Sequence, residues 1–105
     1  MALFYVAPKN GGKIENIERA KQITHDLQVA DLENSYICPL LLFSHLRYGE
    51  IGYDAEMELC LDILSACDKL IVASDFVESK GVKKEIDFAN LVNMEVQFLE
   101  DTEQY

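Results

Sequence analysis

Short apolar segments alternate with longer amphipathic segments along this chain, and that alternation limits the possible folds more than any other feature. Period-2 or continuous apolar patterns predict strands at residues 2–7, 35–38, 69–74 and 95–99. Apolar residues at helical spacing predict helices at residues 14–29, 55–67 and 79–91, and the apolar but irregular segment at residues 40–53 has room for a short helix near 40–46. Strands that alternate with helices form a parallel sheet that is covered on both faces.

Right-handed crossovers leave few ways to arrange such strands. We expect an α/β fold of three layers, a flavodoxin- or Rossmann-like doubly wound parallel sheet of four to five strands in the order 2-1-3-4. The first and third strands are then neighbours, and the direction of winding changes between them. Ligands of such sheets bind at this switch point, at the carboxyl ends of the strands.

The length and composition fit one soluble domain. The 105 residues are enough for a modest core, so we expect a single domain over residues 1–105 with a frayed acidic tail at 100–105. No apolar run approaches the ~20 residues of a membrane span, and the first residues do not resemble a signal peptide. We therefore expect no membrane partner.

The three cysteines have no paired spacing, which indicates free thiols and a cytoplasmic location. No Cys-x-x-Cys motif occurs, and His25 and His45 have no ligand-spaced companions. We therefore expect no metal site, and nothing in the sequence calls for a cofactor.

The net charge of −10 argues against a nucleic-acid polymer as partner, because phosphate neutralisation needs a basic face. Five of the nine basic residues nevertheless gather after the first strand and at the start of the 79–91 helix: Lys9, Lys13, Lys80, Lys83 and Lys84. If the fold joins these places, they form a small positive patch that suits a mononucleotide. Chance clustering in exposed loops is the alternative.

Residues 79–85, SKGVKKE, form the most informative motif. Ser79 is a candidate N-cap, and the amides of Gly81 and Val82 lie at the positive end of the helix dipole, which favours anions. Glu85 has only uncharged neighbours three and four residues away. It therefore lies on or beside the apolar stripe, and its carboxylate leans back toward the anion site. The alternative is a glutamate that reaches water from the edge of the stripe.

The expected sheet order brings two groups of residues to the switch point. The candidate binding residues from the first strand and its loop are Ala7, Asn10 and Gly11, with Tyr5 beside them. Those from the third strand and the next helix are Asp75, Ser79, Lys80, Gly81 and Val82, with Glu85 behind them.

Several segments together resemble the nucleoside 2-deoxyribosyltransferase-like superfamily, over roughly residues 2–99. They are Tyr5-Val6-Ala7, Asn16-Ile17-Glu18-Arg19-Ala20, Cys38-Pro39-Leu40, Cys67-Asp68 and Ser79-x-Gly81-Val82-x-x-Glu85-Ile86-x-x-Ala89. This superfamily includes the 2′-deoxynucleoside 5′-monophosphate N-glycosidases. The likeness is strongest to its small uncharacterised phage and bacterial domains.

The resemblance implies that Glu85 is a nucleophile that attacks the anomeric carbon of a 2-deoxyribosyl group. It also implies that Tyr5 lies near the sugar and that Ser79 and Gly81 hold a 5′-phosphate. Lys80 and Lys83 could reinforce that phosphate site. The partner would be a nucleoside or nucleotide, the activity that of a hydrolase or transferase, and the assembly a homo-oligomer.

One position departs from the characterised enzymes, which carry a carboxylate where this chain has Cys60. Glu58 and Asp62 are each two residues away, about 200° around a helix, so neither replaces it. Asp54, Glu56 and Asp75 remain open as sources of an acid. A nucleotide-binding module without turnover is therefore the alternative function. A small interaction protein without a ligand is a third.

Overall fold

A parallel sheet forms the middle layer of the computed structural model, which describes residues 1–9, 13–47, 49–73 and 79–99. Its strands are β1 (Leu3–Ala7), β2 (Ser35–Ile37), β3 (Lys69–Val72) and β4 (Glu95–Phe98). All neighbours pair in parallel, and the order is β2-β1-β3-β4. This order confirms the doubly wound sheet expected from the sequence.

The register places β1 at the centre of the sheet. Tyr5 pairs with Ile37 of β2 on one side and with Leu70 of β3 on the other. Ala7 pairs with Val72, so β1 and β3 end side by side. The segments that leave these two carboxyl ends therefore start from the same edge of the sheet, which is the switch point of a doubly wound fold.

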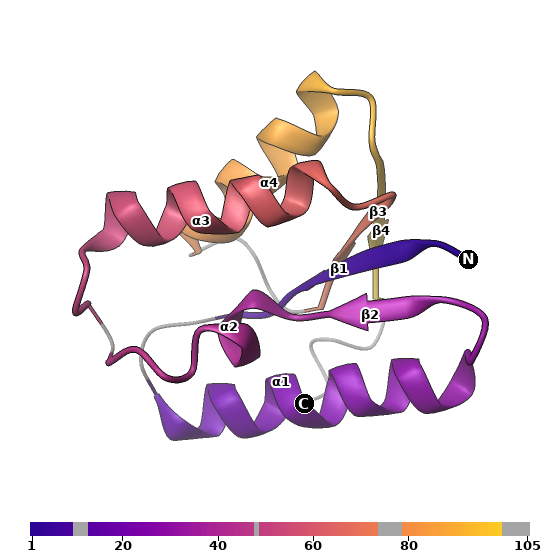
Figure 1. Ribbon diagram of the computed structural model, residues 1–105, viewed down its shortest axis with the longest axis horizontal. Coiled ribbons are helices and arrows are strands. Elements are labelled where there is room, and N and C mark those ends of the chain that lie inside the picture. The colour runs from indigo at the N-terminus through magenta and orange to yellow at the C-terminus, as the bar shows by residue number, and fades with distance from the viewer. Residues whose placement is uncertain (10–12, 48, 74–78, 100–105) are drawn as a thin grey trace.

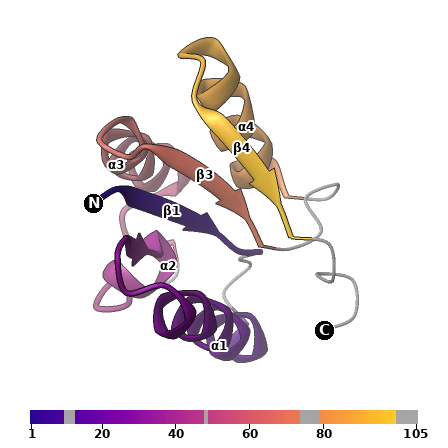
Figure 2. The same ribbon diagram turned by 90° about the vertical axis from the view of Figure 1, so that its right-hand side faces the viewer.

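Helices cover both faces of the sheet. Figures 1 and 2 show α1 (Ile14–Ala30) and α2 (Pro39–Leu42) on one face, and α3 (Tyr53–Ser65) and α4 (Lys80–Leu91) on the other. Alternate residues of β1 enter the two cores, as a strand requires. Tyr5 and Ala7 pack with buried residues of α3 and α4, whereas Val6 packs with α1.

Two helices begin earlier than the sequence pattern suggests. α3 starts at Tyr53 rather than 55, after Gly52 at φ 89° reverses the chain in a conformation that favours glycine. α2 starts at Pro39, which takes the first helical position, where its missing N–H costs no hydrogen bond. None of the helices in the described residues is long and apolar enough to cross a membrane.

Candidate functional site

A buried carboxylate lies close to the N-terminal end of α4. Glu85 is in the second turn of this helix, and only 7% of it is exposed. The hydroxyl of Tyr5, itself fully buried in β1, donates a hydrogen bond to Oε2 of Glu85. The bond ties the central strand to α4, and it holds one carboxylate oxygen in a fixed direction. The sequence placed Glu85 on or beside the apolar stripe of its helix, and its burial in the structure confirms that placement.

Burial changes the acidity of both partners. Loss of solvent raises the pKa of Glu85 from 4.5 to about 7, although the hydrogen bond from Tyr5 opposes the rise. Burial, and then the charge of Glu85, raise the pKa of Tyr5 well above its usual value. The phenol therefore remains a donor at any physiological pH, whereas Glu85 exchanges its proton near neutrality. Titration near neutrality is typical of functional carboxylates.

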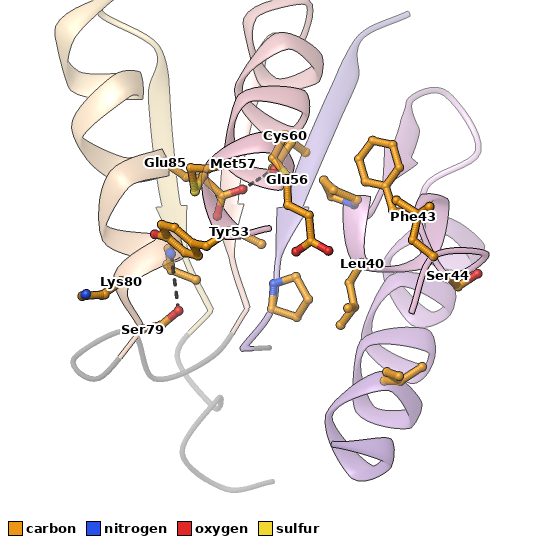
Figure 3. Close-up of a pocket in the computed structure, with 18 of the residues that line it drawn as sticks. Leu40, Phe43, Ser44, Tyr53, Glu56, Met57, Cys60, Ser79, Lys80 and Glu85 are labelled. Carbon is orange, nitrogen blue, oxygen red and sulfur yellow. Dashed lines mark hydrogen bonds between the residues drawn. The ribbon is translucent and has the colours of Figure 1, made fainter. Parts of the chain in front are cut away.

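Glu85 and Tyr5 face a cavity of about 510 Å³ at the carboxyl end of β1, bordered by α2, α3 and the start of α4 (Figure 3). Seven of the candidate residues predicted from the sequence line it: Tyr5, Ala7, Ser79, Lys80, Gly81, Val82 and Glu85. The structure thus brings together residues from β1 and from α4, as the expected strand order required. Asn10, Gly11 and Asp75 lie outside the residues that the structure describes.

The start of α4 forms one end of the cavity. Ser79 is the N-cap, as expected, and its hydroxyl oxygen accepts a hydrogen bond from the Val82 amide at 3.3 Å. That bond occupies the Val82 amide, which the sequence motif had offered to an anion. The amides of Lys80 and Gly81 precede the first helical hydrogen bonds and have no helical acceptor. An anion in the cavity would therefore meet these two amides and the Ser79 hydroxyl.

Lys80 and Gly81 also belong to this end of the cavity, and their side-chain positions affect it in different ways. The exposed Lys80 side chain extends away from the other labelled side chains in Figure 3, so its amide is nearer the cavity than its ammonium group. A Cβ at Gly81 would lie 3.8 Å from Sδ of Met57, an ordinary van der Waals distance. The glycine is therefore not required by close packing, but its missing side chain leaves the approach to Glu85 wider.

Cys60 of α3 lies next to the buried pair. Burial, and then the negative charge of Glu85, raise the pKa of its thiol to about 11. A thiol with that pKa keeps its proton at neutral pH and gives it up reluctantly. The structure therefore places a weak acid beside Glu85 at this position.

A second carboxylate, Glu56, also lines the cavity, and the sequence did not select it from its neighbours. It lies one turn before Cys60 on α3 and is half-buried. Asp54, Glu58 and Asp62 on the same helix are exposed, and none of them lines the cavity. The four-residue spacing from Cys60, which puts both on one helix face, is the signal that could have identified Glu56.

The remaining wall is largely apolar, and part of it comes from the segment at residues 40–53 that the sequence left irregular. Leu40 and Phe43 contribute from α2 and its C-terminal end, and Tyr53 and Met57 from the first turns of α3. The ring of Tyr53 also has Nζ of Lys84 4.9 Å from its centroid. A flat, apolar ligand group fits such walls better than a charged one. Among the described residues, no group of three histidine, cysteine or acidic side chains is placed to hold a metal ion.

The fold and the cavity define an α/β protein of Rossmann-like architecture with a buried carboxylate at its switch point. Residues 5–98 match the family described as Domain of unknown function (DUF4406), and the chain belongs to that family. The match includes both Tyr5 and Glu85. No curated protein and no solved structure matches the chain significantly. The family description names no activity, and it does not by itself support the resemblance to deoxyribosyltransferases.

Proposed function

We propose that the cavity binds a nucleoside or its 5′-monophosphate and that Glu85 acts on the N-glycosidic bond of this ligand. The observation that carries the proposal is the buried Glu85, which Tyr5 holds in a cavity whose other end is a helix N-terminus. A phosphate suits the free amides of Lys80 and Gly81. Glu85 follows Ser79 by six positions, roughly 9 Å of helical rise, and a sugar ring fits between a phosphate and a carboxylate at that spacing.

The chemistry needs a carboxylate oxygen that can reach the anomeric carbon. Tyr5 occupies Oε2 of Glu85, so Oε1 is the oxygen that would attack C1′. The bond from C1′ to the base nitrogen breaks, its electron pair leaves with the base, and an ester forms between C1′ and Glu85. Water then attacks C1′, gives its proton to a base or solvent, and releases Glu85.

A binding module without turnover is the second candidate, and Cys60 favours it. Protonation of the departing base by a positioned acid is worth ~10²–10⁴-fold in rate. A thiol with a pKa of about 11 is a poor donor for this step. A cavity that keeps Glu85 but has Cys60 at the position of the proton-donating acid would bind a nucleotide more readily than it would cleave one.

The test is incubation of the purified protein with the common deoxynucleoside monophosphates, followed by chromatography for free base. We expect base release by the wild type and its loss in Glu85→Gln. Glu58→Gln is the matched control, since it makes the same chemical change at an exposed position on α3. Nucleotide binding without release would favour the module. The absence of both binding and base release would refute the proposal.

Two further expectations accompany this function. The negative charge of −10 continues to argue against a nucleic-acid polymer as partner. A homo-oligomer and a cytoplasmic location stay predictions, which sedimentation analysis and fractionation of the native host would test.

A further inference from the structure

Glu56 is an acidic residue in a part of the cavity wall that is otherwise largely apolar. In Figure 3 its carboxylate projects into the space between the α4 side of the cavity and the side formed by Leu40 and Phe43. Its neighbours in the lining include the apolar or aromatic side chains of Tyr53 and Met57. Glu56 is half-buried, so water reaches its carboxylate, and a ligand that displaces this water must supply hydrogen-bond donors in its place. No side chain among the described residues forms a hydrogen bond or salt bridge with the Glu56 carboxylate, so a ligand can supply the donor.

The layout of the cavity decides which part of a nucleotide would meet Glu56. The N-terminus of α4 suits the phosphate, and Glu85 with Tyr5 suits the sugar. Figure 3 shows Glu56 between Glu85 and the side of the cavity formed by Leu40 and Phe43. The base is the remaining part of the ligand, and an apolar wall suits its flat faces. This step rests on the proposed function, because it takes the orientation of the ligand from it.

We propose that Glu56 selects the base, and that the ligand carries an exocyclic amino group that donates to the Glu56 carboxylate. An ionised carboxylate accepts hydrogen bonds and cannot donate them. An amino group, as on cytosine or adenine, offers the matching donor. A carbonyl oxygen at the same place, as on uracil or hypoxanthine, would set acceptor against acceptor in a partly dry site. Sites of this kind reject the mismatched ligand strongly.

The test compares ligands that differ at that one group. Isothermal titration calorimetry would measure deoxycytidine against deoxyuridine monophosphate, and deoxyadenosine against deoxyinosine monophosphate. In at least one pair we expect the amino ligand to bind the wild type about tenfold more tightly or better. If the wild type cleaves a ligand, the same titrations are made in the Glu85→Gln background, where the nucleophile is absent.

Two variants distinguish a specific role of Glu56 from the general effect of removing one negative charge from α3. Glu56→Gln should bring the affinity ratio of the selective pair close to one, because an amide can rotate to present either a donor or an acceptor. Glu58→Gln removes one negative charge from the exposed side of the same helix and should keep the wild-type ratio. A change in ratio, unlike a loss of affinity, does not follow from damage to the fold.

The outcomes distinguish this inference from the proposed function. If no nucleotide binds, both are overturned. If nucleotides bind but neither pair shows a preference, or if Glu56→Gln keeps the preference, the selection by Glu56 is overturned and the nucleotide site stands. A preference lost in Glu56→Gln and kept in Glu58→Gln supports the inference.

Discussion

Replacing Glu85 with glutamine should stabilise the protein at alkaline pH, even though it removes the central group of the site. The pKa of Glu85 rises from 4.5 to about 7 on folding because burial disfavours its charged form. The folded state therefore binds the Glu85 proton more tightly than the unfolded state does. The resulting stability is fully present below pH 4.5 and is lost as the pH rises through about 7.

The size of the effect follows from the same pair of values. A tenfold change in proton affinity is worth about 1.4 kcal/mol, so the rise from 4.5 to about 7 corresponds to about 3 kcal/mol. Glutamine has nearly the same shape, stays neutral at every pH, and can accept the Tyr5 hydrogen bond through its carbonyl oxygen. Glu85→Gln should therefore match the wild type near pH 4.5 and exceed it by about 3 kcal/mol near pH 8.5.

Urea denaturation at pH 4.5, 6, 7 and 8.5 measures this difference through the free energy of unfolding. Glu58→Gln, an exposed change of the same kind, should show no comparable dependence on pH. A constant difference between Glu85→Gln and the wild type across this range would refute the argument. So would a wild type that gains stability between pH 5 and 8 relative to the variant.

Two further predictions concern the partners of this group. Tyr5→Phe should raise the pKa of Glu85 further above about 7, because the hydrogen bond that it removes stabilises the charged carboxylate. NMR titration of the glutamate carboxyl carbons would measure this pKa. An unchanged or lower pKa would contradict a stabilising role for the bond. Ser79→Ala should cost about 1 kcal/mol of unfolding free energy through loss of the N-cap. Ser79→Asp should keep the cap but weaken binding of a nucleoside monophosphate, and equal binding by both variants would argue against phosphate at this end.

The fold could be predicted because its signals are local and repeated. Each strand, and each helix except the four-residue α2, has its own apolar pattern, and the handedness of crossovers then limits the order of strands. The position of Glu85 followed from its own helix, because its neighbours at three and four residues are uncharged. Tyr5 and Glu85 could be expected to lie close together because β1 and β3 are neighbouring parallel strands, and Glu85 is on the helix that follows β3.

The rest of the site depends on how helices pack, which local patterns do not contain. The spacing from Cys60 puts Glu56, unlike Asp54 and Glu58, on the same face of α3, but only the packing of that helix on the sheet shows that this face borders the cavity. The apolar wall at Leu40 and Phe43 could not be predicted either, because α2 is too short to show a helical period of its own. The Val82 amide was misjudged for a different reason: the sequence motif did not count the bond that the Ser79 cap makes.

The hydrogen bond between Tyr5 and Glu85 joins positions 80 residues apart. During synthesis, β1 leaves the ribosome long before α4 does, so the Tyr5 hydroxyl has no carboxylate to meet for most of translation. The central pairing of β1 with β3 faces the same delay, because Phe4 pairs with Lys69. Folding that must wait for distant contacts is slow and leaves apolar strands exposed meanwhile. We therefore expect nascent chains that stop before α4 to depend on chaperones.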